Sequence, residues 1–260
     1  MTQKIQAVLL PGGVLPAELA YPAAVEALGP EVHACYKELE MYATETPPEG
    51  DFLEREVAGI GAFAEAAGFE RFHLVGYSAG AASSLAFCAS HPERLLSLTL
   101  NEPGWIGTKG RSPVEVEFMR SVERVISLPP EQRMAEFVRI QIASGVEPPP
   151  PPDGPPPPWM PQRLAAMPVF LETSRTAEID HDALRRFSRP VLYILGGRSA
   201  PVYRAMADRL SGVFQDFTLK EFPERHHFDP PHRAEPDAFA AVVLEHWRRA
   251  IAETTTDTTA

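Results

Sequence analysis

The amino-acid sequence predicts an α/β fold, with a mostly parallel central sheet, helices on both of its faces and an inserted, mainly helical segment. Three observations lead to this prediction. Short apolar runs of strand length alternate with longer segments in which apolar residues recur at helical spacing. The alternation stops near residue 104 and resumes near residue 189. The chain has 260 residues, 44% of them hydrophobic, which is enough for one large core.

The first half of the chain starts with strand candidates and a helix. Ile5–Leu10 is an apolar run that ends in the turn-rich loop PGGVLP, and Val32–Met41 is a weaker strand candidate. Apolar residues at helical spacing predict a helix over Asp51–Ala67, with Asp51 as its N-cap and Gly68 as its C-cap.

The alternation of strands and helices continues with a second predicted helix between two predicted strands. Arg71–Gly76 is the next predicted strand, Ala79–Ser90 the next helix and Leu95–Leu100 the strand that follows. Because strands alternate with helices, the connections are typical of a parallel sheet.

The inserted segment is expected to be helical and to contain a stiff strap. Residues 112–128 and 130–145 have helical character, and residues 147–161 contain ten of the 28 prolines in the chain. Such a run lacks amide donors and favours extended polyproline II structure. It predicts a strap or lid connector, and a ligand for a proline-binding domain is the alternative.

The last part returns to strands and helices. Strands are predicted over 191–197 and 214–222 and helices over 200–211 and 236–253. The predicted division is a core of residues 1–103 and 189–253, a cap of 104–188 with the strap at 147–161, and a disordered tail of 254–260.

Charge and cysteine content exclude several classes of protein. The net charge of −11 and the sequence pI of about 5.2 argue against a nucleic-acid or anionic-membrane partner. Cys35 and Cys88 form neither a disulfide framework nor a metal spacing, so buried thiols in a reducing compartment are expected. The first residues lack signal-peptide features and no apolar run approaches membrane-spanning length, so the expected location is the cytoplasm.

One motif carries chemistry. Gly76-Tyr77-Ser78-Ala79-Gly80 stands between a predicted strand and a predicted helix, and it resembles the nucleophile elbow of the α/β-hydrolase superfamily. Small neighbours let the strand and the helix approach closely around a serine on a sharp turn. The element order of nearly the whole chain agrees with this resemblance. The alternative is that Ser78 simply caps the helix.

The resemblance implies a histidine between the last strand and the final helix. The loop there offers His226, His227 and His232. Relatives have an apolar residue after their histidine, and His227-Phe228 fits this pattern, so His227 is the predicted base and His226 the alternative. His232 is expected to cap or pack. These histidines with Asp229 could also suggest a metal site, but the prolines of this loop prevent ligand pairing on one helix face, and no metal is expected.

The acid departs from the commonest pattern of the superfamily. Many relatives carry it in the turn after the strand at 191–197, where this chain has Ser199. A subset carries it after the strand that follows the nucleophile helix, and Glu102 stands there. Glu102 is therefore the predicted acid. A capping or ion-paired glutamate is the alternative interpretation, and the fallback acids are Asp180, Asp182 and Asp208.

The resemblance also implies two backbone donors for an oxyanion. Ala79 follows the nucleophile, and Gly13 in the first loop is the second predicted donor, with Val14 as the alternative. Tyr77, Trp105 and Val14 are expected to line the substrate pocket, although Tyr77 and Trp105 could be ordinary core aromatics.

These features imply a serine hydrolase that cleaves a carboxylic ester, or a related lactone or thioester, through an acyl-enzyme. The expected partner is a small-molecule acyl substrate, and such a mechanism requires no cofactor. A cofactor-free haloperoxidase or a C–C bond hydrolase would have the same motifs. Two further classes of protein fit the same sequence. One is a non-catalytic binder or receptor that retains the triad, and the second is an interaction protein that acts through its proline run.

Overall fold

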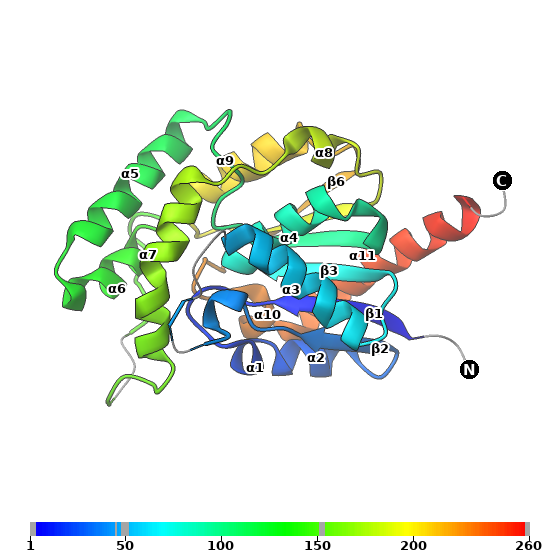
Figure 1. Cartoon of the computed structure of the whole chain (residues 1–260), viewed down its shortest axis with the longest axis horizontal. Coiled ribbons are helices and arrows are strands. Elements are labelled where there is room, and N and C mark those ends of the chain that lie inside the picture. Colours follow the sequence, from blue (N-terminus) through cyan, green and yellow to red (C-terminus); the bar gives the residue numbers. More distant parts are fainter. Residues whose placement is uncertain (1–3, 45, 48–51, 151–153, 258–260) are drawn as a thin grey trace.

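A computed structural model describes residues 4–44, 46–47, 52–150 and 154–257 of the chain (Figure 1). Its centre is a six-stranded sheet with the order β2-β1-β3-β4-β5-β6, and all five pairings are parallel. The strands are β1 (Ile5–Leu10), β2 (Val32–Tyr36), β3 (Phe72–Tyr77), β4 (Leu95–Asn101), β5 (Val191–Gly196) and β6 (Phe217–Phe222). The predicted α/β architecture is confirmed.

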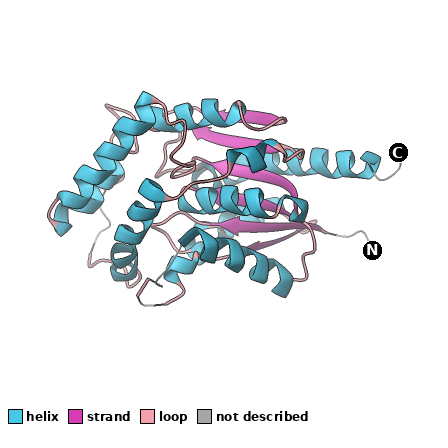
Figure 2. Cartoon of the chain, turned by 45° about the horizontal axis from the view of Figure 1, so that its top comes forward, coloured by secondary structure: helices cyan, strands magenta, loops and turns pink. Residues whose placement is uncertain are grey.

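Helices cover both faces of the sheet (Figure 2). The first face packs against α3 (Phe52–Ala66), α4 (Ala79–Ser90) and α9 (Pro201–Ser211), and the second against α2 (Pro22–Leu28) and α11 (Pro236–Asp257). Alternation along the strands produces the two cores. On β5, Tyr193 and Leu195 belong to the first core, whereas Leu192 and Ile194 belong to the second.

The segment between β4 and β5 is largely helical, as expected. Three of its helices lie together beyond the end of the sheet that is opposite to both termini (Figure 1). They are α5 (Pro113–Ser127), α6 (Pro130–Arg139) and α7 (Met160–Thr176), and α8 (His181–Arg185) then returns to pack near α4. The chain passes from α6 to α7 through the proline-rich stretch, of which residues 151–153 lie outside the described part. Short helices complete the described structure at α1 (Ala17–Ala20), η1 (Glu40–Tyr42), η2 (Pro92–Arg94) and α10 (Pro231–Ala234).

The second predicted strand is shorter in the structure. It ends at Tyr36 because the following residues form the 3₁₀ turn η1, which a buried carboxylate holds. Glu56 of α3 is fully buried, and its Oε1 accepts hydrogen bonds from the amides of Glu40 (2.6 Å) and Met41 (3.4 Å). Burial raises the pKa of Glu56 to about 8, and the ammonium of Lys37 opposes this rise.

The ends of helices α6 and α11 differ from the expected bounds, and the expected start of α3 lies outside the described residues. Helix α6 ends at Arg139 because the chain then turns into an isolated antiparallel bridge between Ile142 and Ser199. Helix α11 continues to Asp257 and corrects the boundary expected at residue 253. The Thr254 hydroxyl supports this last turn by donating to the Ala250 carbonyl (2.9 Å). The predicted N-cap, Asp51, lies outside the described residues.

The predicted stop at Gly68 agrees with the structure. Helix α3 ends at Ala66, and Gly68 adopts a φ of 73°. The amide of Gly68 donates to the Glu65 carbonyl (2.9 Å) and that of Phe69 to the Ala64 carbonyl (2.8 Å). This pair of bonds closes the helix end, and the left-handed position favours glycine.

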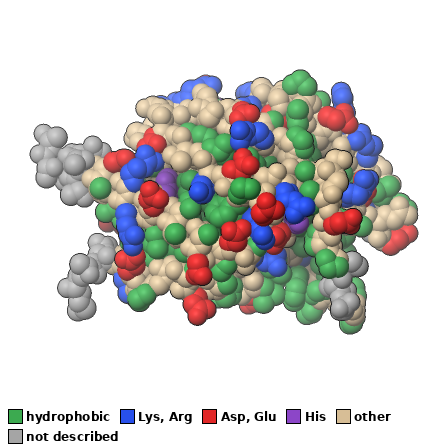
Figure 3. Space-filling view, turned by 180° about the vertical axis from the view of Figure 1, so that it is seen from behind, with side chains coloured by type: hydrophobic (Ala, Val, Ile, Leu, Met, Phe, Trp, Pro, Cys, Tyr) green, Lys and Arg blue, Asp and Glu red, His purple; other side chains and the backbone are tan. Residues whose placement is uncertain are grey.

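Charged side chains of both signs share the molecular surface. Acidic and basic groups interleave on the face seen from behind (Figure 3). Among the described helices, none is both long enough and apolar enough to cross a bilayer.

Two histidines are buried inside the fold, away from the loop that carries His227. His73 on β3 stacks on Trp247 with ring centroids 5.1 Å apart, and its Nδ1 lies 2.8 Å from the Ser97 hydroxyl. His246 on α11 is also buried. Burial lowers the pKa of His73 to about 3 and that of His246 to about 4, so both rings are neutral at pH 7.

His246 should therefore make folding sensitive to acid. The unfolded chain takes up a proton on this ring below about pH 6.5, whereas the folded chain resists it. Folding should thus lose stability as pH falls from about 6.5 towards 4. In His246→Gln this contribution is absent, and the drop in unfolding free energy between pH 7 and 4.5 should be about 2 kcal/mol smaller than in the wild type. Urea denaturation measures both. His33→Gln, at an exposed position, is the control, and parallel curves for wild type and His246→Gln would contradict the prediction.

Candidate active site

The motif residue Ser78 occupies a sharp turn between β3 and α4. Its backbone has φ 52° and ψ −114°, in the left-handed half of conformational space that a serine rarely adopts. Backbone hydrogen bonds hold the turn from both sides. Ser78 donates to the Asn101 carbonyl (3.0 Å) and accepts from the Gly104 amide (2.9 Å), while the Gly80 amide donates to the Pro11 carbonyl (3.0 Å). The loops after β1 and β4 therefore fix the position of Ser78.

The glycines of the motif allow this close approach. A Cβ atom on Gly76 would lie 2.5 Å from the Ala81 Cα atom, and one on Gly80 would lie 2.5 Å from the Pro11 carbonyl oxygen. Real Cβ contacts are not this short, so neither position has room for a side chain.

Ser78, His227 and Glu102 come together although they are distant in the sequence. The Ser78 Oγ lies 3.1 Å from His227 Nε2, and His227 Nδ1 lies 2.9 Å from Glu102 Oε2. Both His227 and Glu102 are almost fully buried. The other carboxylate oxygen of Glu102 accepts a hydrogen bond of 2.7 Å from the amide of Gly196 at the end of β5. Glu102 itself has a φ of 45°, so its turn as well as that of Ser78 departs from ordinary backbone geometry.

Two tyrosines contact His227, one at its ring and one at its main chain. The ring of Tyr203 on α9 stacks on it with centroids 4.4 Å apart and an interplanar angle of 9°. The hydroxyl of Tyr203 donates to Gln141 Oε1 (2.7 Å), which connects this ring to the end of α6. The hydroxyl of Tyr77 donates to the main-chain carbonyl of His227. The sequence does not single out Tyr203 or Gln141, because a tyrosine on an amphipathic helix has the pattern of an ordinary core residue.

The alternative histidines have other surroundings. His226 accepts a hydrogen bond at Nδ1 from the Phe228 amide (3.2 Å), whereas the ring that contacts the serine is that of His227. His232 is buried, stacks on Tyr21 and accepts from the Asn101 side-chain amide (3.2 Å). Burial lowers the pKa of His232 to about 3. It packs, as the sequence suggested.

The fallback acids lie on the surface with local partners. Asp180 caps α8 by accepting from the amides of Asp182 (2.9 Å) and Ala183 (3.0 Å). Asp182 pairs with Arg185, and Asp208 pairs with Arg204 on α9. Glu102 is the candidate acid that contacts His227.

The two predicted backbone donors lie on the loops beside Ser78. Neither the Gly13 amide nor the Ala79 amide donates a hydrogen bond to another residue in the described ranges. The Gly13 carbonyl accepts from the Tyr42 hydroxyl (2.6 Å), which fixes the peptide group that follows the Gly13 amide. Both amides are therefore available to an oxygen atom of a ligand.

Ser78 and His227 open onto a cavity of about 140 Å³. Most of its walls are apolar and come from the first loop, from the residues next to the serine and histidine, and from the inserted helices. The lining residues are Gly12, Gly13, Val14, Leu15, Tyr42, Tyr77, Ser78, Met134, Phe137, Arg163, Met167, Phe170, His227, Phe228 and Arg233.

The cavity corrects one expected pocket residue. Tyr77 and Val14 line it, but Trp105 does not. The Trp105 indole is buried against Phe52 and Phe170, with ring centroids 6.4 Å and 5.0 Å away. It therefore supports Phe170, which does reach the cavity.

An ion pair joins the inserted helix α7 to the core beside the cavity. Arg163 is almost fully buried, and its guanidinium contacts both oxygens of Glu38 at 2.6 Å and 3.3 Å. The same guanidinium lies over the Tyr42 ring, with its Cζ 3.5 Å from the ring centroid. The adjacent Gln162 side chain donates to the carbonyls of Tyr42 (3.0 Å) and Thr44 (2.6 Å).

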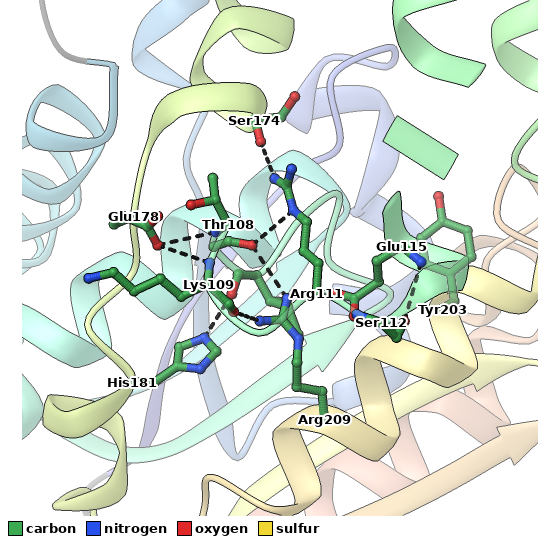
Figure 4. A network of polar contacts seen from close by, with 12 residues as sticks. Thr108, Lys109, Arg111, Ser112, Glu115, Ser174, Glu178, His181, Tyr203 and Arg209 are labelled. Atoms are coloured by element: carbon green, nitrogen blue, oxygen red, sulfur yellow. Dashed lines mark hydrogen bonds and ion pairs between the residues drawn. The ribbon is translucent and has the colours of Figure 1, made fainter. Parts of the chain in front are cut away.

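A second polar network ties together the two places where the chain enters and leaves the inserted helices (Figure 4). Near the exit from β4, the amides of Thr108 and Lys109 donate to Glu178 Oε2 at 3.2 Å and 3.3 Å, and Glu178 lies after the end of α7. Arg209 of α9 donates to the Lys109 carbonyl (2.6 Å) and pairs with the buried carboxylate of Glu115 (2.6 Å). The inserted helices are thus attached at this network and at Arg163.

No group of three or more histidine, cysteine, aspartate or glutamate side chains is placed to hold a metal ion within the described residues. Cys35 and Cys88 are both free, and burial raises the pKa of each thiol.

Comparison with known proteins agrees with this geometry. The sequence model described as "Alpha/beta hydrolase family" matches residues 7–242, so the chain belongs to the alpha/beta hydrolase family. The resemblance to the α/β-hydrolase superfamily seen in its sequence is confirmed.

The individual proteins that resemble this chain share either a short stretch of sequence or a low overall identity with it. A 2-hydroxy-6-oxo-6-phenylhexa-2,4-dienoate hydrolase from Comamonas testosteroni is 32% identical over 76 residues, a match that covers 29% of this chain and 27% of that protein. A thermophilic esterase from Thermogutta terrifontis is similar in structure, with a TM-score of 0.67 at 18% identity over 96% of this chain and 92% of that one. A 2-hydroxy-6-oxo-6-phenylhexa-2,4-dienoate hydrolase from Rhodococcus sp. strain RHA1 has a TM-score of 0.64 at 19% identity, covering 95% and 91% of the two chains. The structural likenesses show the shared fold.

The close approach at Gly80 leads to a stability prediction. In Gly80→Ala, the new methyl group would collide with the Pro11 carbonyl and Leu10, so the loop or the helix must move. Overpacking of this kind costs about 1–3 kcal/mol, and urea denaturation should show a loss of this size. Gly212→Ala is the matched control, because its Cβ would have only an ordinary contact of 3.5 Å and its φ is −84°. Equal stabilities for the two variants would contradict the prediction.

Proposed function

We propose that this protein is a serine hydrolase that cleaves a carboxylic ester, or a related lactone or thioester, through an acyl-enzyme. One observation carries the proposal. A continuous line of contacts runs from Ser78 Oγ through both nitrogens of His227 to Glu102, with spacings of 3.1 Å and 2.9 Å, and its serine end faces the cavity.

In the proposed reaction, Ser78 attacks the acyl carbonyl while His227 Nε2 takes the hydroxyl proton. Glu102 accepts a hydrogen bond from Nδ1–H, which fixes the ring and stabilises its charged form. The imidazolium then gives its proton to the leaving group. Water enters, loses a proton to His227 and cleaves the acyl-enzyme. Tyr203 stacks on the ring and favours the cation on its face.

The negative oxygen of the tetrahedral intermediate would be stabilised by the amides of Gly13 and Ala79. Amides that lack an internal acceptor and are fixed in advance suit this role, because they need not reorganise as charge develops. Tyr42 supports the loop by its bond to the Gly13 carbonyl.

Cleavage of a carbon–carbon bond is the second candidate. The family relative from Comamonas testosteroni and the structure from Rhodococcus carry names of dienoate hydrolases, and such an enzyme can use the same serine and histidine. A cofactor-free haloperoxidase and a non-catalytic binder that keeps these residues are further hypotheses that the sequence supports.

The proposed nucleophile can be tested by active-site labelling. A fluorophosphonate probe should label the wild type, and the protein should hydrolyse p-nitrophenyl esters of short acids. Ser78→Ala removes the oxygen that forms the covalent bond, so both signals should fall by a factor on the order of 10³ or more. Ser90→Ala, which changes a serine at the far end of α4, is the control. If the wild type neither labels nor turns over, the hydrolase proposal fails and the binder hypothesis gains. Turnover of a dienoate ketone in preference to esters would favour the second candidate.

The unusual acid is tested separately. Glu102→Gln keeps the shape of the side chain but loses the charge that stabilises imidazolium, and its amide can present a donor to His227. We expect kcat to fall on the order of 10³-fold or more, with a smaller change in KM. Asp208→Asn should leave both constants close to wild type, because Asp208 is exposed and pairs with Arg204. A Glu102→Gln variant with wild-type kcat would remove Glu102 from the mechanism.

A further inference from the structure

Two arginines, Arg163 and Arg233, line the cavity beside Ser78, and they differ in whether the protein itself pairs their charge. The charge of Arg163 is already paired. Its two terminal nitrogens contact the oxygens of Glu38, and the flat face of its guanidinium covers the Tyr42 ring. Arg163 is thus occupied by the protein itself.

Arg233 is placed differently. It lies on α10, is exposed to solvent at the mouth of the cavity, and its side chain makes no ion pair or hydrogen bond with another residue in the described part of the chain. Of the acidic groups nearest to it in sequence, Asp237 makes no ion pair with Arg233 in the described part of the chain, and the other two have another partner. Asp229 and Glu235 both pair with Arg225, at 2.6 Å and 2.8 Å. Arg233 therefore presents an available guanidinium to a ligand in the cavity.

The positive charge of Arg233 lies beside a cavity whose other described lining residues offer it no negative group. No aspartate or glutamate is among the described residues that line the cavity, and the remaining walls are chiefly apolar, including Met134, Phe137, Met167 and Phe170. The chain as a whole carries a net charge of −11, which repels anions at long range. An anion that approaches the serine would thus find its local counter-charge at Arg233.

The reaction at Ser78 does not account for this charge. The amides of Gly13 and Ala79 are available for the oxyanion, and Glu102 balances the imidazolium. A guanidinium binds a carboxylate through two parallel hydrogen bonds, and it fixes the orientation of the ligand as well as its position.

We propose that the substrate carries a carboxylate group besides its scissile acyl bond, and that Arg233 binds this carboxylate while the apolar walls hold the carbon chain. This inference rests on the proposed function, since it names the class of substrate for the same cavity. Arg233 is then the residue that selects acidic esters over neutral ones of equal length.

Matched pairs of esters test the proposal. The p-nitrophenyl monoester of glutaric acid is compared with p-nitrophenyl valerate, which has the same number of acyl carbons and no charge. A second pair, p-acetoxybenzoate and phenyl acetate, places the carboxylate on the leaving group instead. The wild type should prefer the acidic member of at least one pair in kcat/KM. In Arg233→Gln this preference should fall about 10-fold, mainly through KM, because a charge-assisted contact is lost.

Two further variants sharpen the result. Arg233→Lys keeps the charge but not the planar fork, so it should retain part of the preference. Arg248→Gln removes the same charge from an exposed position on α11, where Arg248 pairs with Glu31, and should leave the preference unchanged. Raising the salt concentration should weaken the preference of the wild type, because the contact is solvent-exposed. An equal preference in wild type and Arg233→Gln for both pairs would overturn the proposal.

A binding measurement separates this inference from the proposed function. Ser78→Ala and the double variant Ser78→Ala/Arg233→Gln are titrated calorimetrically with the glutarate monoester and with the valerate ester. We expect the acidic ester to bind about 10-fold more weakly when Arg233 is absent, and the neutral ester to bind equally to both proteins. This result would support anion binding even if the wild type failed to turn over esters. Equal binding of the acidic ester would contradict it even in an active esterase.

Discussion

The backbone of Ser78 holds its left-handed conformation where the chain after β1 and the chain at the end of β4 pack closely against the turn between β3 and α4. The loop after β1 accepts from Gly80, the loop after β4 contacts Ser78 on both sides, and the glycines leave space for these bonds. A turn of this kind costs about 1–3 kcal/mol locally, so the surrounding sheet must supply the compensation. The same loops carry Gly13 and Glu102. Consequently, the packing that holds the serine also sets the places of the candidate acid, Glu102, and of the Gly13 amide.

Much of the fold follows from periodicity and turn residues. The first strand, Ile5–Leu10, and the helix Ala79–Ser90 have the bounds that their sequences predict, because an apolar run and small residues between clear turns leave few choices. The end of the second strand could not be predicted. It depends on Glu56, a carboxylate buried 15 or more residues away in sequence, which holds the turn at Glu40. Helix α7 could not be predicted as a separate element either, since Pro168 interrupts its sequence pattern.

In the candidate site, too, some residues could be predicted from the sequence and others could not. Ser78, His227 and Glu102 could be proposed from sequence because each follows a strand or precedes a helix at a place where the ends of parallel strands converge. The residues that hold these three side chains in place could not be proposed from sequence. The stacking of Tyr203 on His227 and the pairing of Arg163 with Glu38 join residues from unrelated segments, and only the folded chain brings them together. Trp105 is expected in the pocket because it lies near the nucleophile elbow, whereas the folded chain buries its indole against Phe52 and Phe170.

The hydrogen bond from the Gly196 amide to Glu102 shows how the turn after β5 contributes without an acidic side chain. A main-chain donor survives nearly every substitution in its neighbourhood, so this support depends on the path of the chain rather than on the identity of Ser199. The constraint falls instead on Gly196, whose Cβ would lie 2.6 Å from the Arg225 carbonyl oxygen. Gly197 is under the same constraint, since its Cβ would lie 2.6 Å from the Pro223 carbonyl oxygen, so neither glycine can be replaced without a shift of the main chain. A search for relatives that relies on an acidic residue after β5 would overlook proteins built in this way.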